Sequence, residues 1–103
     1  MVAEPVEPEI EAARLLYRRK LARVFETIIH QGIRAGEMPA QDVSASAACV
    51  VGSLFEGLVG PLAFETAATD RDRWLQAVAI VSFCMRATSG RDVRFEPSEH
   101  PPL

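Results

Sequence analysis

Few side chains in this sequence have both the type and the spacing that chemistry at a site requires. Glu26 and His30 are four positions apart, a spacing that would place a carboxylate and an imidazole on one face of a helix as two ligands of a metal ion. Such pairs arise often by chance, and a histidine near the end of a helix more often interacts with the helix dipole or with solvent. We therefore expect no metal ion and no cofactor.

The two cysteines, Cys49 and Cys84, each lie within an apolar stretch and far from each other in the sequence. A metal site or a disulfide framework would need more Cys or His residues at short, fixed spacings. The surroundings of both residues favour reduced thiols that are buried as small apolar side chains.

Glu56 is the only charged residue in the apolar stretch 43–59. A carboxylate among apolar side chains has to find a partner, face a cavity or reach the edge of the structure. The structural interpretation, which the sequence favours, gives it a partner such as Arg86 or a place at the rim of a helical bundle. The functional interpretation makes it a polar anchor in the wall of a ligand pocket.

Basic residues gather at Arg18, Arg19 and Lys20, with Arg14 and Arg23 nearby. They spread around a helix rather than along one stripe, and the 11 Lys and Arg of the chain are outnumbered by 14 Asp and Glu. A solvated helix face is therefore the better interpretation, and the charge gives no reason to bind nucleic acid. No glycine-rich phosphate loop, nucleophile elbow or pair of catalytic carboxylates is present, so we expect no enzyme activity.

Apolar residues that recur three and four positions apart predict a first helix over about 8–35. Pro8 suits the first turn of a helix, and Gly36 suits the position just after its end. Charged residues occupy the other faces, so this helix behaves as an outer helix. The residues before it, 1–7, are expected to form a flexible lead.

Two more helices are predicted over about 43–59 and 71–89, and both are apolar nearly all the way round. Residues 91–103 hold three prolines and are expected to form a flexible tail. The helical domain would then span 8–90. Caps are expected from Asp42 for the second helix, from Thr69 or Asp70 for the start of the third, and from Gly90 for its end.

The amount of apolar surface predicts that two copies pair. The chain has 103 residues, 49% of them apolar, and a domain of this size buries only about two-thirds of the surface of its unfolded chain. Three helices packed together would leave apolar faces of the second and third exposed, which is rare on soluble monomers. We expect an all-α fold whose three-helix unit forms a homodimer through a four-helix bundle. Small residues that would let helices approach across this contact, or that fit beneath bulky neighbours within one copy, are Ala45, Cys49, Gly52 or Ser53, and Gly60.

The compartment expected from the sequence is the cytoplasm, because the acidic first residues lack the basic segment and apolar run of a secretory signal. The stretch 43–64 is long enough to cross a bilayer. Glu56, several Gly, Pro and Ser residues, and the lack of flanking Lys or Arg argue against a membrane span.

A family resemblance is carried by three features of the sequence. These are the helix end Gly-Ile-Arg-Ala-Gly-Glu at 32–37, a loop containing Asp42, and the Ala-rich apolar helix at 47–62. Over 16–90, about three-quarters of the chain, the sequence resembles the C-terminal regulatory domain of TetR-family transcriptional regulators. The resemblance implies that the second and third helices build the dimer interface and that the first helix lines an effector pocket.

The resemblance also implies roles for individual residues. The implied effector-binding residues are Tyr17, Phe25, Phe55 and Glu56. The implied interface residues are Val51, Leu54, Leu58, Trp74, Val78, Val81 and Met85. Family members carry an N-terminal helix-turn-helix domain that is not in this sequence, so we expect no direct DNA binding by the chain; in a fragment, DNA would be bound through the missing domain. The expected function is dimerisation and sensing of a small apolar effector, and the alternative is a freestanding helical homodimerisation module without a ligand.

Overall fold

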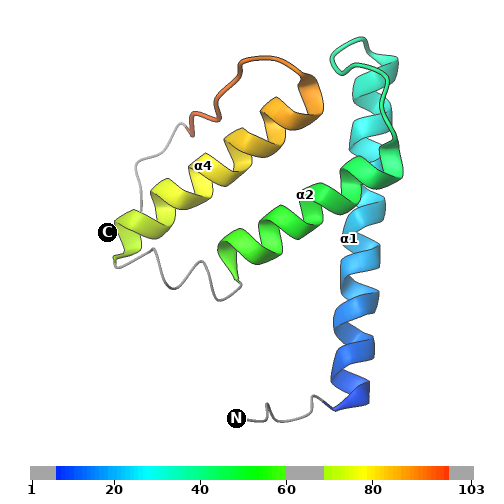
Figure 1. The fold of residues 1–103 in the computed structure, drawn as a ribbon, viewed down its shortest axis with the longest axis vertical. Helices are drawn as coiled ribbons and strands as arrows, with labels where there is room; N and C mark the ends of the chain where they lie inside the picture. The colour runs from blue at the N-terminus through cyan, green and yellow to red at the C-terminus, as the bar shows by residue number, and fades with distance from the viewer. Residues whose placement is uncertain (1–6, 60–68, 98–103) are drawn as a thin grey trace.

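The computed structural model describes residues 7–59 and 69–97. Within these residues it contains three α-helices and no β-strand: α1 (Pro8–Arg34), α2 (Val43–Leu58) and α4 (Asp70–Ser89) (Figure 1). The all-α prediction is confirmed, and each expected helix boundary lies within one residue of the observed one. The ends of the predicted lead and tail, 1–6 and 98–103, lie outside the described residues, as does Gly60.

Side chains at the helix starts satisfy backbone N–H groups that have no partner within the helix. The Asp42 carboxylate accepts a hydrogen bond from the backbone N–H of Ala45 at 2.9 Å. At the start of α4 the Thr69 hydroxyl accepts from the N–H of Asp72 at 3.0 Å, and the Asp72 carboxylate accepts from the N–H of Thr69 at 3.1 Å. This reciprocal capping box fixes where α4 begins. Gly90 ends α4 in the left-handed region, with φ of 67°.

The chain turns back on α1 immediately after its last residue. Gly36 has φ of 76°, a conformation that only glycine adopts without strain. The backbone N–H groups of Glu37 and Met38 both donate to the carbonyl oxygen of Gly32, at 2.9 and 3.1 Å. The Met38 sulfur would lie 2.7 Å from a Cβ at position 32, so the glycine there lets the loop pack against the helix.

The middle helix, α2, packs against α1 on one side and against α4 on the other (Figure 1). The apolar side chains buried among the described residues come from all three helices: Ile29 of α1, Ala47, Val50 and Val51 of α2, and Cys84 of α4. This core is small because the first half of α1 extends beyond α2, and every residue from 7 to 20 is exposed.

The segment 91–97 follows α4 and runs back along it (Figure 1). The backbone N–H of Phe95 donates to the buried hydroxyl of Ser82 at 2.8 Å. The Arg86 guanidinium donates to the carbonyl oxygen of Val93 at 3.5 Å. One side of α4 is thereby covered by the chain itself.

Among the described helices, none has the length and apolar character needed to cross a membrane.

Candidate functional site

Three of the four implied effector-binding residues lie around one concavity, which we call the α1–α2 hollow. It has a volume of about 590 Å³ and is lined by Ala13, Arg14, Tyr17, Arg18, Phe55, Glu56 and Val59. Tyr17 belongs to the exposed half of α1, whereas Phe55 and Glu56 belong to the last turns of α2. The crossing of the two helices therefore brings together residues that are about forty positions apart in the sequence.

Arginine and aromatic side chains meet in the α1–α2 hollow. The guanidinium carbon of Arg18 lies 4.7 Å from the centroid of the Phe55 ring, within the range of a cation–π contact. Arg14 is one helical turn before Arg18 on the same face of α1. The sequence had suggested that these arginines belong to a solvated face. Arg14 and Arg18 are indeed exposed, and they also line the concavity, which could not be predicted without knowing how α2 packs against α1.

Glu56 is exposed at the rim of the α1–α2 hollow, as the edge interpretation predicted. Arg86, the partner suggested by the sequence, instead donates to the backbone of Val93. Among the described residues of the lining, the other charged side chains are those of Arg14 and Arg18.

Phe25 does not join the other three effector candidates. It lines a second concavity of about 350 Å³, the three-helix groove, together with Leu54 of α2 and Val81 and Met85 of α4. Phe25 is eight residues beyond Tyr17, which turns its side chain by about 80° around the helix axis. The three-helix groove also receives three of the seven implied interface residues.

The other implied interface residues are distributed between the interior and the surface. Val51 is 5% exposed and is already buried within a single copy. Trp74 and Val78 are half-buried, whereas Leu58 is 40% exposed. These positions differ widely in exposure, and their role in an interface between two copies stays a prediction.

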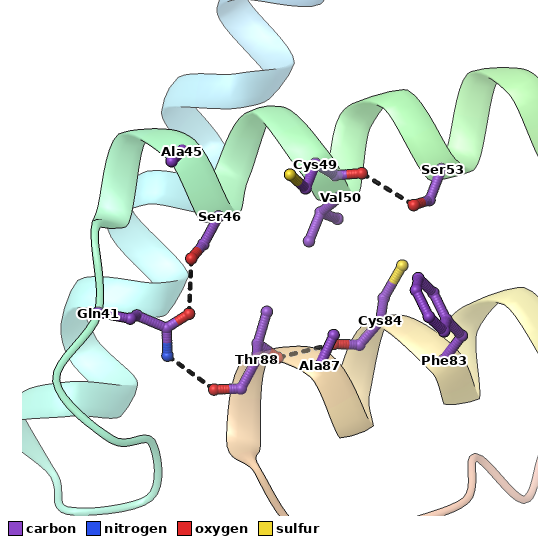
Figure 2. A pocket seen from close by; sticks show the side chains of 10 residues that line it. All are labelled: Gln41, Ala45, Ser46, Cys49, Val50, Ser53, Phe83, Cys84, Ala87 and Thr88. Atoms are coloured by element: carbon purple, nitrogen blue, oxygen red, sulfur yellow. Dashed lines mark hydrogen bonds between the residues drawn. The ribbon is translucent and has the colours of Figure 1, made fainter.

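A different continuous surface, the open face, is formed by α2 and α4 where they lie side by side. It consists of Ala45, Cys49 and Ser53 of α2 and of Phe83 and Ala87 of α4, around a concavity of about 340 Å³ (Figure 2). In Figure 2, α1 lies behind α2, so the open face is on the side that turns away from α1.

Small and apolar side chains extend the open face along both helices. On α4, Leu75, Ala79, Phe83 and Ala87 follow one another at intervals of four residues, and all four are exposed. On α2, a Cβ added to the exposed Gly52 would meet no atom within 4 Å. Gly52 is therefore not covered by a bulky neighbour within one copy, but it lines a concavity beside Arg18, Arg19 and Ala22 of α1 and not the open face. Of the small residues of α2, Ala45, Cys49 and Ser53 line the open face.

Two thiols line the same concavity of the open face from opposite helices (Figure 2). Cys84 is buried, and this burial raises the pKa of its thiol, while a hydrogen bond with Ser53 acts in the opposite direction. Cys49 is exposed, so the expectation of a buried thiol is right for Cys84 and wrong for Cys49. Both are free thiols.

The pair Glu26 and His30 does not gain a third ligand from the fold. His30 is exposed and Glu26 half-buried on α1. Within 7–59 and 69–97, no group of three or more His, Cys, Asp or Glu side chains is placed to hold a metal ion.

No protein-family model, no curated protein and no solved structure matches the chain.

Proposed function

We propose that this chain is the dimerisation and effector-sensing domain of a TetR-like transcriptional regulator, and that two copies join through the open face. The observation that carries the proposal is the exposed apolar stripe of α4 beside the small residues of α2. Phe83 is 54% exposed and lies with Ala87 on the side of α2 and α4 that turns away from α1. Apolar side chains gathered on one face favour association, because pairing removes them from water.

The size of the open face is also adequate for a stable contact. Helices of 16 and 20 residues are about 24 and 30 Å long, and two of them side by side are about 20 Å wide. This is the order of surface that a specific interface uses, about 800 Å² from each partner. A twofold axis through the face would bring two helices of each copy into one four-helix bundle.

Sensing is assigned to the α1–α2 hollow, because its walls belong to two helices that diverge beyond it. A ligand held between Tyr17 and Phe55 would contact the exposed half of α1 and the end of α2 together. It would therefore favour one angle between α1 and α2 over others. Since α2 also contributes to the open face, the same shift would reach the partner copy.

A freestanding pairing module without a ligand is the second candidate function. It is favoured by the 70% exposure of Tyr17, which leaves the α1–α2 hollow wide open to solvent. A thermal-shift screen with apolar and aromatic compounds separates the two candidates, since a ligand that binds the folded chain raises its melting temperature. Uniform absence of stabilisation would favour the module.

The pairing itself is tested by substituting Glu for two equally exposed apolar residues. Phe83→Glu places a charge in the open face, and we expect a loss of at least about 2 kcal/mol of pairing free energy, about thirtyfold in Kd. Val24→Glu is the matched control, because Val24 is 53% exposed but belongs to α1. Sedimentation velocity measures both variants, and circular dichroism shows whether each stays helical. Equal effects of the two substitutions would contradict pairing through the open face.

A further inference from the structure

We infer that the α1–α2 hollow binds a planar aromatic molecule with a single negative charge, such as an aromatic carboxylate, and that Arg14 and Arg18 receive that charge. This inference rests on the sensing role proposed above and adds to it the chemical class of the ligand.

The aromatic side chains supply the surface for a flat apolar body. Tyr17 of α1 and Phe55 of α2 both line the hollow, which has about 590 Å³ of space. The open ring of Tyr17, 70% exposed, can lose its contact with water only if something packs on it. Rings prefer to stack or to meet edge to face with other rings, so a planar ligand fits these walls better than an aliphatic one.

The arginines supply the charge. The guanidinium carbon of Arg18 lies 4.7 Å from the centroid of the Phe55 ring, so the ring covers one flat face of the guanidinium group. A stacked guanidinium keeps the N–H groups at its edge available for a carboxylate. Arg14 is one turn away on the same helix face, and both cations line the hollow. Within the described residues neither guanidinium forms a hydrogen bond or an ion pair that would compete with a ligand.

Glu56 limits the charge of the ligand. The described residues of the lining hold two guanidinium groups and one carboxylate, so together they are positively charged and repel a cationic ligand. A second negative charge on the ligand would face Glu56 at the rim, and like charges at close range are unfavourable. The arrangement therefore favours one negative charge over two, and over a positive charge.

The test is a titration of the full chain with three flat probes that differ in charge: 2-naphthoate, neutral 2-naphthamide and cationic 2-naphthylmethylammonium. Isothermal titration calorimetry measures affinity, and shifts of the Tyr17 ring signals in NMR spectra locate the probe. We expect naphthoate to bind most tightly, and Arg14→Gln or Arg18→Gln to weaken it by about tenfold while leaving the amide unchanged. Arg23→Gln is the matched control, an exposed α1 arginine outside the hollow, and should change the affinity less than twofold.

Two kinds of result would overturn the inference, and only the second would also contradict the proposed sensing role of the hollow. Equal or tighter binding of the amide or the ammonium probe, or naphthoate binding that is unaffected by both Gln variants, would refute the anionic class while sensing by the hollow stands. Failure of all three probes to shift the Tyr17 signals would remove the inference together with the sensing role. Pairing through the open face is measured separately and would survive either result.

Discussion

Gln41 and Thr88, 47 positions apart, are joined by a hydrogen bond in which the side-chain amide of Gln41 donates to the carbonyl oxygen of Thr88 at 2.7 Å (Figure 2). That carbonyl belongs to the last turn of α4, where backbone acceptors have no partner within the helix. The amide oxygen of Gln41 in turn accepts from the Ser46 hydroxyl at 2.7 Å. One side chain thus ties the start of α2 to the end of α4 and sets their relative position at the open face.

Removing this link should destabilise the fold. Gln41→Met keeps most of the volume but leaves the Thr88 carbonyl and the Ser46 hydroxyl without their partner, and we expect a loss of about 1–2 kcal/mol in the free energy of unfolding. Urea denaturation followed by circular dichroism measures the loss. Gln31→Met, on the exposed surface of α1, should change it by less than about 0.5 kcal/mol. If the two variants unfolded at the same urea concentration, the bridging role of Gln41 would be wrong.

The capping box of α4 gives a second stability prediction. Thr69→Ala removes the hydroxyl that accepts from Asp72, and the expected cost is about 1 kcal/mol. Thr27→Ala is the control, because the Thr27 hydroxyl only donates to the carbonyl of Arg23 within α1. Its loss should cost less than about 0.5 kcal/mol. Thermal denaturation compares them, and a larger loss for Thr27→Ala would contradict the assignment.

The helices and their ends could be predicted from the sequence because they depend on local signals. Spacings of three and four residues, Asp42 before α2 and Gly90 after α4 all act within a few positions, and the structure confirms them. The packing partners of α2 and α4 could not be predicted this way. Both helices are apolar nearly all round, so periodicity did not show that Val51 turns inward while Cys49 turns outward.

In the candidate site, too, the features that depend on packing between helices could not be predicted from the sequence. Of the four residues named by placement on matching helices, the structure brings Tyr17, Phe55 and Glu56 around one concavity, and their role in binding an effector stays a prediction. Phe25 lines the three-helix groove instead. The role of Arg18 in the hollow depends on its contact with Phe55, a residue 37 positions later, and no local pattern reports such a contact.

The rates at which the two cysteines are alkylated test pairing in the wild-type protein, without any substitution. Cys49 is exposed on the open face of a single copy, so iodoacetamide should alkylate it readily in dilute protein and more slowly as the concentration rises and copies pair. Cys84 should react slowly throughout, because burial restricts access and raises the pKa of its thiol, which keeps it protonated. Mass spectrometry of peptides measures both rates. A Cys49 rate that is independent of protein concentration would count against the open face as the contact.

The raised pKa of Cys84 also sets the sign of a pH effect on stability. A thiol that ionises at higher pH in the folded chain than in the unfolded chain contributes its stabilisation fully at neutral pH. That contribution is lost as alkaline pH rises from the ordinary thiol pKa through the raised one. Cys84→Ala should therefore flatten the decline of the melting temperature in this alkaline range, whereas Cys49→Ala should leave the decline as it is. If the melting temperatures of the two variants declined equally over this pH range, the contribution of Cys84 to the pH dependence would be refuted.

The central claim is that two copies of this chain associate through the open face, and the most direct test is the mass of the wild-type protein in solution. Sedimentation equilibrium at micromolar concentration should give twice the 11.3 kDa of one chain. Phe83→Glu should shift the distribution toward a single folded copy at the same concentration. A wild-type protein that stays helical with the mass of one chain across the whole concentration series would contradict the account.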